Sequence, residues 1–291
     1  MSVAATRTSY LWVRLFVLAS FVSTCAVGCD KASKKSVERA RHHVAELVKT
    51  VESDVQEVRT GLPQGAKQLE KLYASDKPPA DDLPAVREAL EKARNKVQDL
   101  RVAKSTFFAL ADLQGVVLRN DQEQDLMAGK PLFAAFPELR GALQGKYVEA
   151  RGSMPEAAGV AGRPDAQWAA AQPVVAGGAV RGLYVTGWSW AAYAYRLENS
   201  IRTTVRSEIG ETGKMPLLYV YVVVGKTAYG APVSPEVNAK AIADADALSK
   251  ARDKQPYSME LDITGREFGL AVARTPALGP DVGVAVLRSE T

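Results

Sequence analysis

The sequence predicts an α+β fold, in which an N-terminal helical hairpin or stalk precedes one or two modules built on antiparallel sheets. Three observations predict it. Apolar residues recur at three- and four-residue spacing over the first third of the chain, short apolar strands separated by glycine turns follow, and one amphipathic segment divides these strands into two groups. With 291 residues the chain is long enough for one or two domains beyond a helical stalk.

The N-terminal segment has the features of an export signal. Arg7 and Arg14 flank a short polar start, and an apolar run over residues 15–27 ends in small residues followed by Cys29. This arrangement resembles the lipobox of bacterial lipoproteins, whose cysteine is acylated and becomes the new N-terminus. The resemblance implies a signal peptide over residues 1–28, lipidation of Cys29, and a place in the bacterial cell envelope. The chain would face the periplasm or the exterior from either the inner or the outer membrane.

Two alternatives to this interpretation remain open. The apolar run is also compatible with an uncleaved membrane anchor, although Arg14 lies inside it and a spanning helix needs about 20 apolar residues. Cys25 is a second candidate for acylation, although the residue before it, Thr24, is bulkier than Gly28.

The composition argues against several classes of function. The two cysteines are Cys25 and Cys29, so a chain cut and acylated at Cys29 has no thiol left for catalysis, disulfides or zinc binding. The two histidines, His42 and His43, are adjacent and point about 100° apart on a helix, so they do not chelate one metal together. The net charge of +4 comes from well-mixed charges without a nucleic-acid footprint. We expect no enzymatic activity, no metal, no cofactor and no nucleic-acid partner.

Helical periodicity begins after a short lipidated tether over residues 29–35. Residues 36–104 are expected to form the hairpin or stalk, and the glycines and proline of residues 61–65 are expected to interrupt or kink its first helix. A loop rich in proline and aspartate over residues 75–82 leads to the second helix. The apolar residues of this second helix follow heptad-like steps: Leu83, Val86, Leu90, Ala93, Val97 and Leu100.

The strands fall into two groups with similar layout. Residues 105–190 are expected to form the first module, residues 191–215 a connecting helix, and residues 216–291 a second module with a weaker pattern. In the second module, Ser234 as N-cap and Pro235 as the first helical residue are expected to begin a helix that continues to about residue 251.

Two segments of the first module resemble a known family. Residues 107–121 (FFALADLQGVVLRND) form a strand, an Asp-x-x-Gly turn and a strand, and residues 171–185 (AQPVVAGGAVRGLYV) form a later hairpin. Both resemble the Cache family, the PAS-like ligand-sensing domains found outside the bacterial cytoplasmic membrane. The resemblance covers about residues 103–190 and extends more loosely over residues 217–287. Members usually lie between transmembrane helices and feed a kinase or chemotaxis domain.

This resemblance implies a sensory protein that binds a small ligand. The chain ends at Thr291 without an output domain, so we expect it to act through a separate membrane-protein partner.

Aromatic residues concentrate in the later strands of the first module. Trp168, Tyr184 and Trp188 lie there, near Tyr147 and Arg151. Apolar walls with a few polar groups are typical of small-molecule sites, and the guanidinium of Arg151 has the geometry to bind a carboxylate. We therefore state as a hypothesis that these five residues line a pocket for a small carboxylated ligand. Core packing is the commoner reason for such aromatics, so a non-catalytic envelope scaffold without a ligand remains the alternative.

Overall fold

The computed structural model describes the backbone of residues 9–75, 77–154, 165–210, 213–253 and 255–290, and the side chains from residue 32 onward within these ranges. The side chains of the expected signal peptide and of Cys29 are not among those described. The backbone of residues 9–31 is described and belongs to the first helix. In the part of the chain that is described, no helix has the length and apolar character needed to cross a bilayer.

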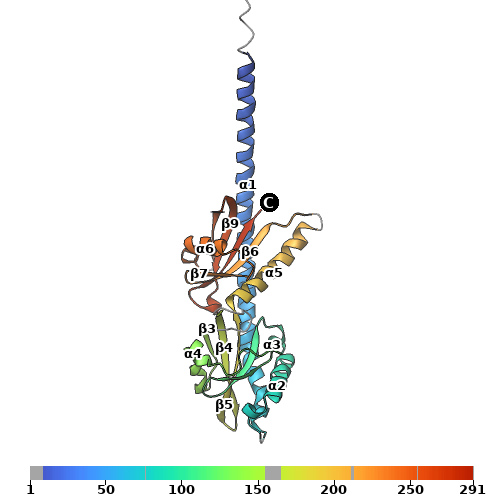
Figure 1. Cartoon of the computed structure of the whole chain (residues 1–291), viewed down its shortest axis with the longest axis vertical. Coiled ribbons are helices and arrows are strands. Elements are labelled where there is room, and N and C mark those ends of the chain that lie inside the picture. Colours follow the sequence, from blue (N-terminus) through green and yellow to red (C-terminus); the bar gives the residue numbers. More distant parts are fainter. Residues whose placement is uncertain (1–8, 76, 155–164, 211–212, 254, 291) are drawn as a thin grey trace, which may run out of the picture.

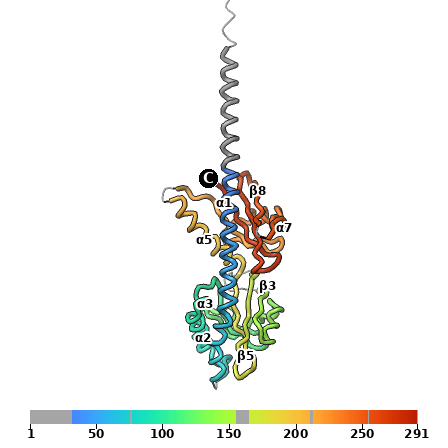
Figure 2. The backbone as a smooth tube through the Cα atoms, turned by 180° about the vertical axis from the view of Figure 1, so that it is seen from behind, coloured from blue at the N-terminus to red at the C-terminus, as the bar shows by residue number. Residues whose placement is uncertain are grey.

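One long helix, α1 (Ser9–Leu69), runs along the molecule and supports both sheets (Figure 1). Its 61 residues correspond to about 90 Å at the usual rise per residue. Seen from behind, it passes along the whole length of both modules (Figure 2). Its buried apolar residues follow one face at three- and four-residue spacing: Ala40, Val44, Leu47, Val51, Val55, Val58, Leu62, Ala66 and Leu69.

The expected interruption of this helix at residues 61–65 is wrong, because α1 continues through the segment. A Cβ atom on Gly61 would lie 2.8 Å from a methyl carbon of Leu100. A Cβ atom on Gly65 would lie 2.6 Å from both Leu100 and the Tyr184 ring. The two glycines therefore permit close packing of α1 against its neighbours, and they do not form a turn.

The second arm of the helical hairpin is short and divided. Two 3₁₀ turns, η1 (Glu70–Tyr73) and η2 (Pro79–Asp81), lead into α2 (Leu83–Lys96), which is followed by α3 (Gln98–Val102). Asp82 caps α2 by accepting a hydrogen bond from the backbone N–H of Ala85 at 3.3 Å. The second helix is not continuous as expected, because Val97 has an extended backbone (φ −94°, ψ 113°) between α2 and α3.

The first module is an antiparallel sheet of five strands in the order β2-β1-β5-β4-β3. On β1, Phe108 and Leu110 join the same buried cluster as α1, while Phe107 and Ala109 face the short elements on the other side. Those elements are α4 (Leu132–Ala135) and η3 (Pro137–Gln144). The strands are β1 (Phe107–Ala111), β2 (Val117–Asn120), β3 (Val148–Met154), β4 (Asp165–Ala176) and β5 (Ala179–Ser189).

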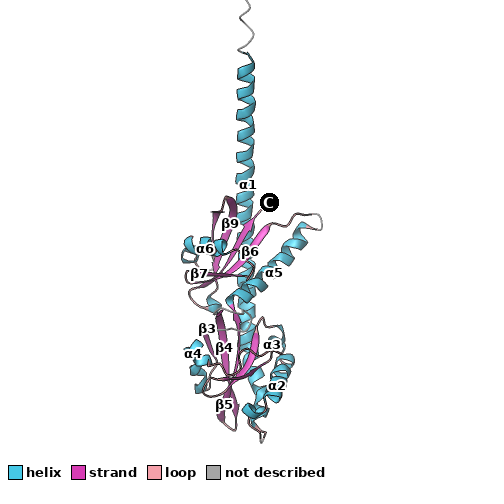
Figure 3. Cartoon of the chain, viewed as in Figure 1, coloured by secondary structure: helices cyan, strands magenta, loops and turns pink. Residues whose placement is uncertain are grey.

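The second module repeats this order with its own five strands, β7-β6-β10-β9-β8 (Figure 3). The helix α5 (Trp190–Ile209) leads into it from β5, and Ser189 caps this helix by accepting a hydrogen bond from the backbone N–H of Ala192. The strands are β6 (Leu217–Val224), β7 (Thr227–Gly230), β8 (Tyr257–Ile263), β9 (Arg266–Arg274) and β10 (Val282–Ser289), and η4 (Pro276–Leu278) precedes β10. The predicted α+β class, with antiparallel sheets behind a helical stalk, is confirmed.

The helix expected from Ser234 to about residue 251 differs from the prediction at both ends. It begins as α6 (Glu236–Asp244) with Pro235 as the N-cap, and Ser234 makes no capping bond. It stops early because Asp246 takes a left-handed conformation (φ 46°), and a separate short helix, α7 (Ala247–Lys250), follows.

A buried polar contact joins the end of β10 to α1. Arg288 on β10 is fully buried, and its Nη1 atom donates a hydrogen bond of 2.7 Å to Nε2 of His43, whose side chain is 1 % exposed. The Nε of Arg288 also donates to the Oε1 of Glu290 at 2.9 Å. Burial and the nearby Arg288 charge lower the pKa of His43, and Glu208 and Glu46 oppose this shift. Neutral His43 is therefore the form that accepts the bond from Arg288.

We expect the stability of the protein to fall as the pH is lowered through 6.5, the ordinary pKa of histidine. The pKa of His43 in the folded protein is lower than this value, so His43 of the unfolded chain binds a proton first as the pH falls. The loss of stability ends once the pH is below the pKa of His43 in the folded protein. The slope from one such group does not exceed about 1.4 kcal/mol per pH unit. Urea unfolding of wild type and His43→Gln at several pH values between 5 and 7.5 measures this effect.

The matched control is His42→Gln, because His42 is the neighbouring residue and its side chain is 65 % exposed. This variant should retain the wild-type dependence on pH. A His43→Gln protein with an unchanged dependence would contradict the assignment to His43.

Candidate functional site

Three of the predicted ligand residues lie in the core between the first sheet and α1. Trp168, Tyr184 and Trp188 are at most 1 % exposed and belong to the cluster that contains the α1 stripe. The rings of Trp168 and Trp188 stack at 4.3 Å between centroids, and Trp188 stacks on Tyr193 of α5 at 4.7 Å. Tyr184 stacks on Phe108 at 5.9 Å. These aromatic rings pack against one another and against the helix.

The stack continues into a buried hydrogen bond with α1. The hydroxyl of Tyr193 donates to Oδ2 of Asp54 at 2.8 Å, and burial raises the pKa of Asp54, an effect that this hydrogen bond opposes. Burial also raises the pKa of Tyr184 well above its usual value, so its hydroxyl is protonated. The aromatic cluster therefore joins the first sheet, α5 and α1 in one rigid unit.

Of the other two predicted residues, Arg151 lies where the two modules meet, and Tyr147, just before β3, packs against the same buried cluster as Tyr184 and Trp188. The Nη1 atom of Arg151 on β3 lies 2.6 Å from Oδ1 of Asp281, in the loop before β10. The hydroxyl of Tyr147 donates to Glu149 at 2.9 Å, and burial raises the pKa of Tyr147. Arg151 is thus partly exposed at the junction, whereas Tyr184 and Trp188 are buried in the core.

A second ion pair at this junction ties α1 to both modules. Arg59 of α1 binds Glu149 of β3 through Nε at 2.6 Å and Nη2 at 3.0 Å. The same Nη2 donates to the backbone oxygen of Ala277 in η4 at 2.9 Å. The hydrogen bond to Glu149 raises the pKa of Arg59. Arg59, Arg151, Trp168 and Asp281 all border one groove of about 530 Å³, which we call the junction groove.

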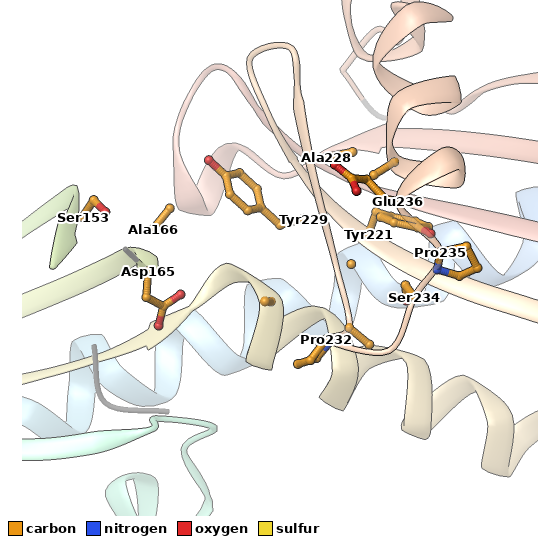
Figure 4. A pocket seen from close by; sticks show the side chains of 14 residues that line it. Ser153, Asp165, Ala166, Tyr221, Ala228, Tyr229, Pro232, Ser234, Pro235 and Glu236 are labelled. Carbon is orange, nitrogen blue, oxygen red and sulfur yellow. The ribbon is translucent and has the colours of Figure 1, made fainter. Parts of the chain in front are cut away.

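A second hollow, which we call the junction cavity, lies further along strands β3 and β4 than the junction groove (Figure 4). Its volume is about 590 Å³, within the range of small-molecule sites. Ser153 and Asp165 line it from the first module, and Tyr221, Tyr229 and Glu236 line it from the second (Figure 4). The site is therefore built by both modules together.

Local structure explains how the second module forms its wall of the junction cavity. The chain leaves β7 at Gly230, where a Cβ atom would lie 2.5 Å from the Tyr221 ring, so the absence of a side chain lets the turn pass close to that ring. The turn then leads into α6, which begins at Glu236. Tyr221 is fully buried, and burial raises its pKa to about 12, although the nearby Asn238 and Ser234 side chains act in the opposite direction.

The first module contributes a buried carboxylate. Asp165 begins β4, is 5 % exposed, and its Oδ2 accepts a hydrogen bond from the Gln167 amide at 3.2 Å. No motif in the sequence points to Asp165, Tyr229 or Glu236, and Asp165 is distant in the chain from the other two. The segment before Glu236 has only the pattern of a helix start.

No protein-family model and no curated protein sequence matches the chain. The structure is similar to a domain of a sensory box/GGDEF family protein from Vibrio parahaemolyticus, with a TM-score of 0.59 and 11 % identity over 89 % of this chain and 98 % of that one. It is also similar to the extracellular domain of the histidine kinase vpHK1S-Z8, with a TM-score of 0.60 and 11 % identity over 89 % and 93 %.

A third similar structure is the ligand-binding domain of Mlp24 with asparagine. Its TM-score is 0.50, with 15 % identity over 89 % of this chain and 94 % of that one. At these identities the likeness concerns the fold. The α+β fold expected from the resemblance to Cache domains is confirmed, with one long helix followed by two antiparallel five-stranded sheets.

We expect Trp188→Ala to lower the free energy of unfolding by about 3–5 kcal/mol, because it removes a fully buried, doubly stacked ring. Arg151→Ala should cost less than about 1 kcal/mol, because Arg151 is 34 % and Asp281 50 % exposed. Urea unfolding measures both. The matched aromatic control is Tyr195→Ala on α5, whose residue is 47 % exposed and should cost little. A small loss for Trp188→Ala would contradict its place in the core.

Proposed function

We propose that this chain is an extracytoplasmic sensory protein that binds a small ligand, is held at the membrane by lipid on Cys29, and acts on a separate membrane-protein partner. The observation that carries the proposal is the arrangement of two sheet modules along one helix, with solvent-accessible hollows where the modules meet. The same fold occurs in the extracellular domain of a histidine kinase and in a ligand-binding domain with asparagine. Those proteins are sensory and ligand-binding domains, which favours binding over catalysis.

The position of Cys29 on the long helix supports a lipid anchor next to the second module. Cys29 is seven helical residues before Ser36, a distance of about 10 Å along α1. At Ser36 the helix already contacts the end of the chain, because the backbone N–H of Glu290 donates to the Ser36 hydroxyl at 3.1 Å. A lipid at Cys29 would therefore hold the second module near the membrane surface and the first module away from it.

For the ligand, we propose a carboxylate that binds Arg151 in the junction groove. Arg151 and Asp281 form a partly exposed ion pair, and such pairs stabilise a protein by less than about 1 kcal/mol. A ligand carboxylate can therefore take the place of Asp281 at small cost. Because Asp281 belongs to the second module, this exchange would loosen one of the contacts between the modules and so give ligand binding a structural effect.

A scaffold without a small ligand is the second candidate function. The observation that favours it is the burial of Trp168, Tyr184 and Trp188, which the ligand hypothesis had placed in a pocket. In that case the helices and the stacked modules would serve only to contact other envelope proteins.

We expect Cys29→Ala to abolish incorporation of a fatty-acid analogue in the bacterial host and to leave the protein uncleaved or released from the membrane. Metabolic labelling and fractionation measure this outcome. The matched control is Cys25→Ala, which should still be labelled and cleaved. Labelling that persists in Cys29→Ala and disappears in Cys25→Ala would move the anchor to Cys25.

We expect small organic acids to raise the melting temperature of the wild-type protein in a thermal-shift screen, with succinate as a simple probe. Arg151→Ala should lose this shift, because its guanidinium is the proposed carboxylate partner. Arg181→Ala is the control, since Arg181 is an exposed arginine of the same sheet away from the groove. A screen of amino acids and organic acids without any stabilising compound would favour the scaffold, and a shift that survives in Arg151→Ala would exclude Arg151 as the partner.

A further inference from the structure

The junction groove has two walls of different chemistry. Its charged side chains come mainly from α1 and the first module: Arg59, Glu138, Glu149 and Arg151. The second module contributes an apolar wall, which we define by its four exposed or half-buried residues: Val224, Pro276, Ala277 and Pro280. Among the described residues that line the groove from the second module, Asp281 is the only charged one. A ligand in the groove therefore meets charge on one side and apolar surface on the other.

The guanidinium of Arg151 lies directly beside the turn that forms the apolar wall. A Cβ atom on Gly279, between η4 and β10, would lie 3.4 Å from Cζ and 3.5 Å from Nη1 of Arg151. The backbone oxygen of Asp281 accepts a hydrogen bond of 2.8 Å from the N–H of Gly225, which holds this turn against the end of β6. A carboxylate bound to Arg151 would therefore have the rest of its molecule next to a preformed surface, and preformed surfaces need little ordering on binding.

The charges around Arg151 disfavour a second negative group on the ligand. The Arg59 guanidinium is already engaged by Glu149 at two points. Glu138 is exposed and makes no ion pair within the described part of the chain. Once a ligand carboxylate displaces Asp281 from Arg151, the Asp281 carboxylate is also without its cation. A ligand with a second carboxylate would add a third unpaired negative charge to the groove, and like charges repel.

We infer that the junction groove selects monocarboxylates that carry an apolar group. The carboxylate pairs with Arg151, the apolar group lies on the apolar wall, and Glu138 and the displaced Asp281 repel dicarboxylates. The inference rests on the proposed binding of a carboxylate to Arg151 and names the chemical class of that ligand. A partly exposed ion pair alone supplies little affinity. Each CH₂ group that is fully removed from water tightens binding about fourfold, so the apolar group decides which carboxylate binds best.

The test compares three probes: acetate, hexanoate and adipate. Hexanoate adds four CH₂ groups to acetate, and adipate has the length of hexanoate with a second carboxylate at the far end. Their binding to the full chain is measured by calorimetric titration at low ionic strength. We expect hexanoate to bind at least about tenfold more tightly than either other probe, because Pro276 and Pro280 are exposed and the tail is only partly removed from water. Added salt should narrow the difference between hexanoate and adipate, since it screens the repulsion.

Two variants change the two walls separately. Val224→Thr places a hydroxyl on the apolar wall and should weaken hexanoate binding about threefold while leaving acetate binding unchanged. The matched control is Val233→Thr in the same module, because Val233 is 86 % exposed and lies outside the groove. Glu138→Gln removes the unpaired charge and should tighten adipate binding about threefold with hexanoate unchanged. Because Val224 is half-buried, the melting temperature of its variant is measured first, and exposed Glu138 provides the independent test if that protein does not fold.

Equal binding of the three probes, or tighter binding of adipate than of hexanoate, would overturn the inference. So would hexanoate binding that survives in Arg151→Ala, or wild-type behaviour of both wall variants.

Failure of this inference is distinguishable from failure of the proposed function. If succinate, at the high concentrations of a thermal-shift screen, stabilises wild type and not Arg151→Ala, the carboxylate site stands whatever the preference among the three probes. In that case equal binding of acetate, hexanoate and adipate shows that only the proposed ligand class is wrong. If none of these acids binds, the carboxylate site and the inference are both wrong.

Discussion

The structure depends on one constraint, which is that both sheets bury a face against the same apolar stripe of α1. Residues from Ala40 to Leu69 on this helix are in the same buried cluster as Phe108 and Tyr184 of the first sheet and Val220 and Val284 of the second. Among the described elements, α5 also packs on this face of the second sheet and α2 on that of the first, and α1 is the longest of the three. Packing against α1 therefore fixes the position of each module along the helix, independently of direct contacts between the modules.

The direct contacts between the modules are of a different kind. They include the partly exposed ion pair of Arg151 with Asp281, and Arg59 of α1 adds hydrogen bonds to Glu149 of one module and Ala277 of the other. Exposed ion pairs contribute little to the free energy of unfolding. The main effect of the junction contacts is therefore to define how the two modules are positioned relative to each other.

The cluster of His43, Arg288 and Glu290 is a third kind of contact, and it lies in the middle part of α1, between Cys29 and the region that packs on the first sheet. It joins the last strand to the helix through buried charged and polar groups, with Glu290 also bonded to Ser36. Buried polar groups of this kind specify one register of strand against helix, because a shifted register would leave them without partners. The last strand is therefore held at a defined position along α1, close to the proposed anchor.

The sequence was sufficient to predict where helices and most strands occur and the α+β class, because these follow from local periodicity and turn residues such as Gly177 and Gly225, but it did not predict where each helix is interrupted. It could not determine that Gly61 and Gly65 serve packing, since Leu100 and Tyr184 come close only in the folded protein. The burial of Trp188 in the core and the pairing of Arg151 with Asp281 are visible only in the folded protein. It alone brought Asp165 and Glu236 to one cavity, because which side chains meet across two modules depends on how both sheets seat on α1.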